Sequence, residues 1–155
     1  MDRVRPVAIA LGSNLGDRRA HLDYGVSRLG SLLEHIQVSR YIETTPLDVR
    51  EPQPLFLNAA AIGEATRSAR EVLNALLEIE RDRGRARPFP HAPRTLDLDL
   101  VLFGNQVIDE PGLIVPHPRF HERRFVLEPL SEIGPDLIDP VTGSTVRALL
   151  NLLAT

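Results

Sequence analysis

The feature that most constrains this fold is a run from Thr95 to Phe103 in which every second residue is leucine. A period of two residues is typical of a β-strand, because successive side chains point to opposite faces of a sheet. One predicted face is wholly aliphatic, and the other begins with two acids. The first face carries Leu96, Leu98, Leu100 and Leu102, and the second carries Thr95, Asp97, Asp99, Val101 and Phe103.

Asp97 and Asp99 are neighbours on this second face, about 6–7 Å apart along the backbone. Two carboxylates this close repel one another unless a cation lies between them. Arginine partners or a divalent metal ion satisfy that need, and an all-oxygen pair favours Mg²⁺ or Mn²⁺ over zinc. The alternative interpretation is an antiparallel strand with one solvated face that carries two acids.

The composition indicates one compact domain over residues 1–155. The chain has 155 residues, 43% of them hydrophobic and 25% charged, which is enough for a substantial core. No apolar run reaches membrane-spanning length, and the first residues do not form a signal peptide. Cysteine is absent, which excludes disulfides and thiolate chemistry and agrees with a reducing compartment. We therefore expect a cytoplasmic protein.

All 18 cationic residues are arginine, because the sequence contains no lysine. This excludes a Schiff-base lysine and the lysine of a P-loop. A net charge of −3 argues against general nucleic-acid binding. The arginines are nonetheless clustered, and arginine binds phosphate in a planar, bidentate way. One cluster comprises Arg81, Arg83, Arg85, Arg87 and Arg94, and the other comprises Arg119, Arg123 and Arg124.

The first arginine cluster leads directly into the acidic strand. If the two are also contiguous in space, arginines and carboxylates surround one cleft, which suits a magnesium-bound nucleotide. Phosphoryl transfer depends on positioning and charge neutralisation more than on covalent chemistry, so the lack of cysteine and lysine is no obstacle. The alternative is a solvated helix end.

The order of predicted elements is β-α-β-β-α-β, which is that of the ferredoxin-like fold. We expect an α+β protein with a mainly antiparallel sheet flanked by helices. Residues 106–108 are predicted to return beside the acidic strand as a hairpin across Gly104 and Asn105. The predicted strands are 7–11, 36–42, 56–61 and 95–103, and the predicted helices are 18–33, 69–83, 121–130 and 145–153.

Capping residues mark where the two long helices begin. Asp17 is predicted to cap the first helix, and Ser68 forms a capping box with Glu71 at the second. The turn at residues 12–17 suggests a phosphate loop, but it lacks both the dinucleotide spacing and the P-loop lysine. A tight strand-to-helix turn is the alternative interpretation.

Seven short motifs are spread along nearly the whole chain. They are Leu11–Gly16, Thr45–Leu47, Phe56–Ala60, Gly84–Arg87, Pro93–Asp99, Val115–Arg119 and Arg123–Leu130. Together and in this order they resemble the 6-hydroxymethyl-7,8-dihydropterin pyrophosphokinases of folate biosynthesis. The resemblance implies transfer of the β,γ-pyrophosphoryl group of ATP to the hydroxymethyl oxygen of the pterin, with release of AMP.

The resemblance also implies a role for each matching residue. Asp97 and Asp99 would bind the two Mg²⁺ ions expected with ATP, and the pterin would stack between Phe56 and Phe125. The catalytic residues would be Arg85, Arg94, Asp97 and Asp99. The ATP and phosphate contacts would come from Arg85, Arg94, His117, Arg123 and Glu80. The pterin site would comprise Thr44, Pro46, Leu47, Phe56, Asn58 and Phe125.

Some of these residues have simpler interpretations, and the chain departs from the family pattern in places. Phe56 at the start of a strand is also typical of core, and Glu80 could pair with a neighbouring arginine. The segment 87–93 lacks the tryptophan that covers adenine in some family members and is one residue shorter, so Phe89 or His91 would have to replace it.

Two other functions remain open from the sequence. One is a non-catalytic ligand-binding domain in which the two acids only form ion pairs. The other is a nucleotidyltransferase that uses the acids for a nucleotide–metal complex and releases pyrophosphate instead of AMP. As partners we expect ATP and 6-hydroxymethyl-7,8-dihydropterin, with no nucleic acid and no membrane, and we expect a monomer.

Overall fold

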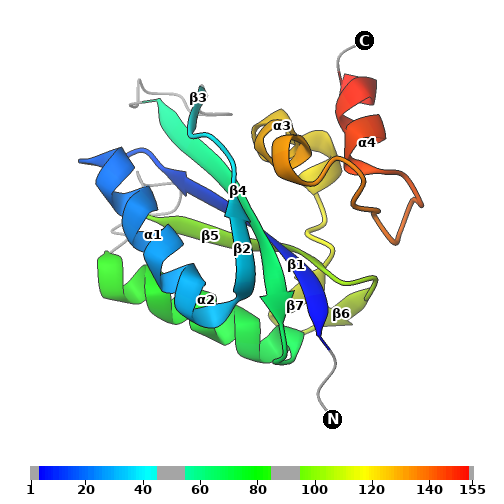
Figure 1. Cartoon of the computed structure of the whole chain (residues 1–155), viewed down its shortest axis with the longest axis horizontal. Coiled ribbons are helices and arrows are strands. Elements are labelled where there is room, and N and C mark those ends of the chain that lie inside the picture. Colours follow the sequence, from blue (N-terminus) through cyan, green and yellow to red (C-terminus); the bar gives the residue numbers. More distant parts are fainter. Residues whose placement is uncertain (1–3, 45–54, 85–94, 154–155) are drawn as a thin grey trace.

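The structure is a computed structural model that describes residues 4–44, 55–84 and 95–153 (Figure 1). Within these ranges none of the helices is both long enough and apolar enough to cross a membrane. The strands are β1 (Arg5–Ser13), β2 (Glu34–Val38), β3 (Ile42–Thr44), β4 (Phe56–Ala65), β5 (Asp97–Phe103), β6 (Ile108–Glu110) and β7 (Leu113–Val115). The helices are α1 (Arg18–Leu32), α2 (Ala69–Arg83), the 3₁₀ helix η1 (Phe120–Glu122), α3 (Arg124–Ile133) and α4 (Val146–Leu153).

The main sheet has the strand order β2-β4-β1-β5, and the short β3 pairs with the beginning of β4. Every pairing in this sheet is antiparallel. An antiparallel sheet in this order, built from a β-α-β-β-α-β chain, is the ferredoxin-like arrangement. The α+β class predicted from the sequence is therefore confirmed.

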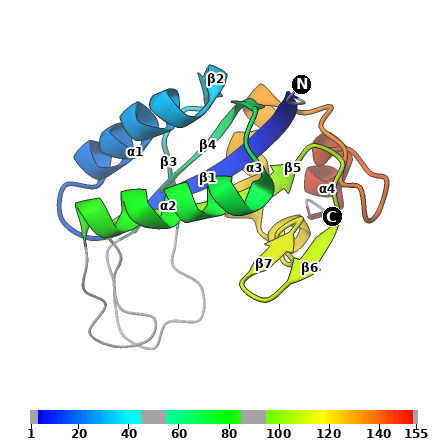
Figure 2. The same ribbon diagram turned by 90° about the horizontal axis from the view of Figure 1, so that it is seen from below.

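Helices cover both faces of the sheet, with α1 and α2 on one side and α3 and α4 on the other (Figures 1 and 2). The central strand β1 is buried on both sides, which explains its continuous apolar run. Ile9 and Leu11 belong to the core beneath α1 and α2, whereas Ala8 and Ala10 belong to the core beneath α3 and α4. The small alanines let α3 approach this second face closely.

Both predicted helix starts are confirmed. The Asp17 side chain accepts a hydrogen bond of 3.1 Å from the backbone N–H of Ala20 at the beginning of α1. At α2 the Ser68 hydroxyl accepts from the Glu71 N–H at 3.2 Å, and the Glu71 carboxylate accepts from the Ser68 N–H at 3.0 Å. This reciprocal pair satisfies two backbone donors that the first turn of a helix leaves open.

The alternation in β5 is interrupted by a register shift. Ile9 of β1 pairs with Leu100, but the preceding Ala8 pairs with Leu102, so one residue of β5 is skipped. The extra residue moves Leu102 to the α3/α4 core and Phe103 to the α1/α2 core. The prediction that Leu102 shares a face with the other leucines is therefore wrong, because a bulge exchanges the two faces beyond it.

The predicted hairpin between β5 and residues 106–108 is also wrong. Strand β6 pairs with β7 in a separate two-stranded sheet. The outer edge of β5 is already used, because the Leu98 N–H donates to Glu80 and the Val101 carbonyl accepts from the His117 N–H at 3.0 Å. A helix side chain and the segment after β7 thus occupy the positions that a return strand would need.

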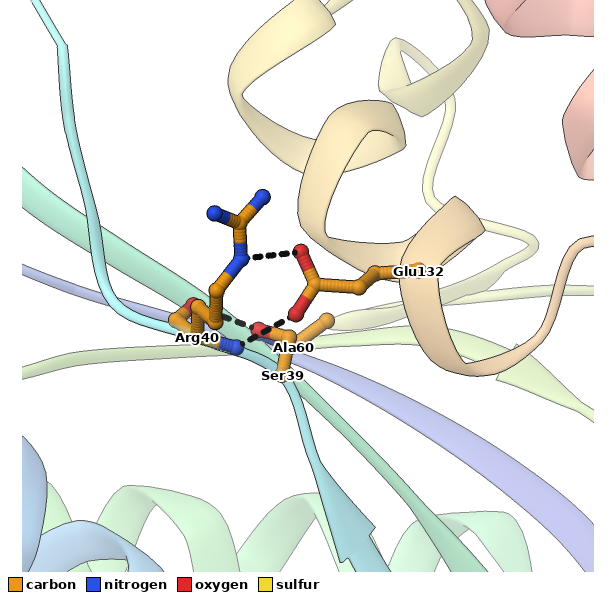
Figure 3. A network of polar contacts seen from close by, with 4 residues as sticks. All are labelled: Ser39, Arg40, Ala60 and Glu132. Atoms are coloured by element: carbon orange, nitrogen blue, oxygen red, sulfur yellow. Dashed lines mark hydrogen bonds and ion pairs between the residues drawn. The ribbon is translucent and has the colours of Figure 1, made fainter.

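The predicted strand 36–42 is two shorter strands joined through Ser39 and Arg40 (Figure 3). The Ser39 hydroxyl accepts from the backbone N–H of Ala60 at 2.9 Å, which ends the regular pairing of β2. The backbone N–H and the Nε of Arg40 donate to the two carboxylate oxygens of Glu132, at 2.8 and 3.0 Å. These bonds tie the β2–β3 connection to α3.

Candidate functional site

The acidic pair lies at the beginning of β5, opposite the end of β1. Asp97 pairs with Gly12 and Asp99 pairs with Ala10. Both aspartates are half-buried, and the Leu98 between them is buried. The register is regular here, so the two carboxylates share one face of the sheet as predicted. That face is the one covered farther along by α3 and α4.

A polar residue lies two strands away on the same face. Asn58 of β4 pairs with Gly12 from the other side of β1, so Asn58, Gly12 and Asp97 form one row across three strands. Adjacent strands are about 4.8 Å apart, which places the ends of the row about 10 Å apart at the backbone. Because the middle residue has no side chain, the space above it is lined by the residues on either side.

Gly12 is required by this arrangement. A Cβ built on Gly12 would lie 3.1 Å from Asn58 Oδ1 and 3.7 Å from Phe56 Cδ1. The first of these distances is below ordinary contact, so any larger residue would press on the amide of Asn58 and approach the ring of Phe56. Glycine therefore leaves space above β1 between the amide of Asn58 and the carboxylates of Asp97 and Asp99.

The amide of Asn58 is held in place by β3. Its side chain is buried, and its Nδ2 donates a hydrogen bond to the hydroxyl of Thr44. Thr44 in turn pairs with Phe56 across the β3–β4 ladder. The structure thus brings together three residues predicted for the pterin site, and Phe56 is half-buried rather than part of the core.

The beginning of α3 contributes an aromatic ring and a cation. The Arg123 guanidinium lies 5.5 Å from the centroid of the Phe125 ring, within the range of a cation–π contact. Phe125 is half-buried and packs against the core that contains Ala10 and Ala60. It therefore lies on the same side of the sheet as Asn58.

His117 follows the buried residues Val115 and Pro116. Its imidazole interacts electrostatically with Arg123 at the beginning of α3 and with Asp97 of β5. Burial and the charge of Arg123 lower the pKa of His117, and the charge of Asp97 opposes this effect. The His117 Nδ1 accepts a hydrogen bond of 3.2 Å from the Arg119 N–H. A neutral imidazole that accepts at Nδ1 carries its proton on Nε2, so His117 is a hydrogen-bond donor at that atom.

Glu80 reaches the acidic strand from α2. Its carboxylate accepts a hydrogen bond of 2.7 Å from the backbone N–H of Leu98, and Leu98 separates the two aspartates. The sequence predicted either an ATP contact or an arginine partner for Glu80. The observed bond is to the strand backbone, so a carboxylate that was assigned to a ligand also supports the acidic pair.

Other predicted site residues lie outside the described ranges. They are Arg85, Arg94, Pro46 and Leu47, together with Phe89 and His91 as candidates for covering adenine.

Sequence reasoning did not find the role of Gly12, which was assigned to a turn and instead lies inside β1. A signal was present, since a glycine at the end of an apolar strand is typical of a close approach by other groups. It also did not predict the contact between Arg83 of α2 and His21 of α1, which are 62 residues apart in sequence.

A hollow next to the sheet lies away from these residues. It is lined by Val4, by the beginning of β1 from Arg5 to Ala8, and by His35, Glu64 and Asp136. None of the predicted site residues lines it. The chemistry predicted from the sequence is therefore at the other end of β1.

The fold is shared with solved structures of larger proteins. A crystal structure of Plasmodium falciparum HPPK-DHPS wild type superposes with a TM-score of 0.77 at 14% sequence identity, covering 98% of this chain and 45% of that one. The same protein with SDX-DHP gives a TM-score of 0.77 at 13% identity. At such low identity these likenesses define the class of fold.

Sequence relatives are much closer. The 2-amino-4-hydroxy-6-hydroxymethyldihydropteridine pyrophosphokinase of Bacillus subtilis is 43% identical over 127 residues, covering 81% of this chain and 75% of the relative. The Pseudomonas aeruginosa enzyme of the same name is 37% identical over 139 residues, covering 86% and 83%. The folic acid synthesis protein fol1 of Pneumocystis carinii is 36% identical, but this chain spans only 19% of its length.

The sequence relatives, together with the α+β fold, define a transferase domain of the pterin pyrophosphokinase class. Residues 8–135 match the family model described as 7,8-dihydro-6-hydroxymethylpterin-pyrophosphokinase (HPPK). The chain belongs to this family, whose pyrophosphoryl transfer is a step of folate biosynthesis.

Proposed function

We propose that this chain transfers the β,γ-pyrophosphoryl group of ATP to the hydroxymethyl oxygen of 6-hydroxymethyl-7,8-dihydropterin, with Asp97 and Asp99 as ligands of Mg²⁺. The observation that supports this most is the row of Asn58, Gly12 and Asp97 across three adjacent strands. It sets an amide that can recognise a heterocycle about 10 Å from a carboxylate pair that can hold a metal–phosphate complex. A pterin carrying a hydroxymethyl group is of a size to bridge that gap.

The donor set of the acidic pair fits Mg²⁺. No group of three metal-ligating side chains occurs among the described residues, so a complete protein cage is not available there. Mg²⁺ does not need one, because it commonly takes one or two carboxylates and completes its shell with water and phosphate oxygens. When bound, the ions would neutralise the phosphate charge and polarise the phosphorus that is attacked.

The remaining residues would bind and orient the two substrates. Neutral His117, with its proton on Nε2, would donate to a phosphate oxygen, and Arg123 would supply positive charge beside it. Arg85 and Arg94 would contribute in the same way. Glu80 would act mainly through the backbone of Leu98, since a carboxylate repels phosphate. The pterin ring would lie against Phe56 and Phe125, with Asn58, Thr44, Pro46 and Leu47 along its polar edge.

The hydroxymethyl oxygen forms a bond to the β-phosphorus, and the bond from that phosphorus to the oxygen bridging the α- and β-phosphates breaks. AMP leaves with the bridging oxygen, and the hydroxyl proton is released. The products are AMP and the pterin pyrophosphate.

Product identity tests the proposal. Purified protein is incubated with ATP, Mg²⁺ and the reduced hydroxymethylpterin, and the products are separated by chromatography. The matched variants are an Asp97→Ala, Asp99→Ala double variant and Asp109→Ala, which removes an exposed acid of β6. We expect stoichiometric AMP and pterin pyrophosphate from the wild type and from Asp109→Ala, and neither product from the double variant.

Other outcomes would overturn the proposal in specific ways. Release of inorganic pyrophosphate instead of AMP would indicate a nucleotidyltransferase. Binding of ATP without turnover would indicate a ligand-binding domain. Full activity in the double variant would exclude Asp97 and Asp99 as the metal ligands while leaving the reaction itself intact. Omitting Mg²⁺ and restoring it, or replacing it with Mn²⁺, tests the metal requirement separately.

A further inference from the structure

The last turn of α2 is attached to α1 through Arg83. The Arg83 Nε donates a hydrogen bond of 2.9 Å to Nδ1 of His21. The same guanidinium lies 4.8 Å from the centroid of the Tyr24 ring, a cation–π distance. His21 and Tyr24 are three residues apart on α1, so one arginine of α2 is held by two neighbouring side chains of the other helix.

This contact requires a neutral His21. An imidazole accepts at Nδ1 only when its proton is on Nε2, and a protonated ring has no acceptor at all. Burial and the charge of Arg83 lower the pKa of His21, whereas the charge of Asp17 and the backbone of Leu15 act in the opposite direction. At neutral pH the ring is therefore neutral, and protonation would both remove the acceptor and set two cations side by side.

The turn that carries Arg83 is also the turn that supports the acidic strand. Glu80 lies three residues before Arg83, and its carboxylate accepts a hydrogen bond of 2.7 Å from the backbone N–H of Leu98. Leu98 is the residue between the two aspartates. Gly84, the next residue after Arg83, lies so close to the segment just before β5 that a Cβ there would be 2.6 Å from the Thr95 side chain. The last turn of α2 thus contacts both the beginning of β5 and the residue Thr95 just before it.

Other charges near this contact do not replace it. Arg28 donates to the Tyr24 hydroxyl at 2.6 Å and to Asp82 at 2.9 Å, but the Asp82 side chain is 43% exposed. An ion pair this exposed contributes little and is screened by salt. Among the polar contacts between α1 and the end of α2, the hydrogen bond between Arg83 and His21 is part-buried, whereas that between Arg28 and Asp82 is exposed.

We infer that His21 is a positioning residue for this reaction. Neutral His21 holds Arg83 and with it the last turn of α2. This turn keeps the Glu80 carboxylate on the backbone N–H of Leu98. The acidic pair on either side of Leu98 therefore keeps the geometry that the metal–nucleotide complex needs. The inference rests on the function proposed above, in which Asp97 and Asp99 receive that complex. The residues of β3 and β4 that are proposed to bind the pterin, Thr44, Phe56 and Asn58, are not part of this chain of contacts.

Two substitutions at His21 separate positioning from simple packing. His21→Asn places an amide oxygen near the position of Nδ1, so it keeps an acceptor for Arg83 but does not titrate. His21→Leu keeps an apolar body and removes the acceptor. Steady-state kinetics between about pH 5.5 and pH 8.5, the range in which histidines titrate, give kcat and the KM of each substrate.

We expect His21→Leu to raise the KM for ATP with Mg²⁺ about threefold to tenfold, the effect of one hydrogen bond, and to leave the KM for the pterin unchanged. His21→Asn should match the wild type at the alkaline end and lose part of the wild-type decline at the acid end. An unchanged KM for ATP in His21→Leu overturns the inference. So does an acid decline in His21→Asn identical to that of the wild type.

Controls distinguish this inference from failure of the fold or of the proposed site. Pterin binding to His21→Leu, measured by calorimetry in the absence of ATP, should equal that of the wild type and reports a folded protein. The Asp97→Ala, Asp99→Ala variant is assayed in parallel. If it stays active, the proposed metal site fails. If it is inactive while both His21 variants behave as the wild type at every pH, only the role of His21 fails.

Discussion

The carboxylate of Glu80 accepts a hydrogen bond of 2.7 Å from the backbone N–H of Leu98. Leu98 lies between Asp97 and Asp99 on the edge strand of the sheet, so α2 fixes the backbone that carries the acidic pair. The bond also satisfies an N–H on the side of β5 that pairs with no strand among the residues that the structure describes. A side chain assigned to ligand binding is thus first a support for the strand.

Replacing Glu80 should reveal this support. Glu80→Ala removes the acceptor from the partly buried Leu98 N–H, which should lower the free energy of unfolding by about 1–3 kcal/mol and also reduce kcat/KM. Glu80→Gln keeps an acceptor oxygen and should recover most of the stability. Denaturant titration measures the first effect and initial rates measure the second. Glu78→Ala, at an exposed position of α2, is the control, and an equal loss in both alanine variants would contradict the prediction.

Gly12→Ala should impair the pterin side of the site selectively. The added Cβ would lie 3.1 Å from Asn58 Oδ1, so the amide must move away from the position fixed by Thr44. We expect the KM for the pterin to rise about tenfold, equivalent to about 1.4 kcal/mol, and the KM for ATP to change much less. Gly30→Ala serves as control, because nothing lies within 4 Å of a Cβ there.

The control variant Gly30→Ala should itself stabilise the protein. Gly30 is an exposed position within α1, where alanine is favoured over glycine by about 0.5–1 kcal/mol. Gly30→Ala should therefore raise the midpoint of unfolding while leaving both KM values unchanged. A similar rise in the pterin KM for both glycine variants would show that the effect of Gly12→Ala is not local.

The sequence predicted the elements of this fold well where local chemistry decides. The caps at Asp17 and Ser68 satisfy helix donors within a few residues, and the leucine alternation defines β5 up to Leu100. It failed beyond that point because the bulge depends on how β1 pairs with β5. A register between strands about 90 residues apart has no local signal.

In the candidate site, too, local spacing could be predicted from the sequence, whereas pairing between distant strands could not. Asp97 and Asp99 share a face because a strand has a period of two, and this could be predicted from spacing alone. The row that joins Asp97 to Asn58 depends on the register of two separate ladders. The hairpin predicted after Gly104 failed for a related reason, because Glu80 and His117 already occupy the free edge of β5. Tertiary contacts decide between pairings that turn residues alone leave open.

Ser39→Ala should destabilise the connection between β2 and β3. The Ser39 hydroxyl accepts from the backbone N–H of Ala60 at 2.9 Å, and Ala60 is buried. Leaving this donor unsatisfied should cost about 1–3 kcal/mol of unfolding free energy. Ser31→Ala, at an exposed position of α1, should cost much less. Equal denaturation midpoints for the two variants would contradict the assignment of this bond.

Acidification should weaken the fold through His117. The native pKa of His117 lies below its ordinary value, because burial and the charge of Arg123 disfavour the imidazolium. Between that native pKa and the unfolded value of about 6.5, the unfolded chain binds more protons than the native chain. The free energy of unfolding therefore falls as the pH drops through this window, and it is level above the window.

His117→Gln removes this contribution and provides the test. Denaturant titrations from about pH 8 to pH 5 stay above the range in which ordinary carboxyl groups titrate. The wild type should lose stability over this range, and His117→Gln should lose less, so that the difference between the two narrows toward acid pH. Asn74→Gln, an exposed and non-titrating change on α2, should follow the wild type. Parallel curves for wild type and His117→Gln would mean that the imidazole is not held neutral by its surroundings.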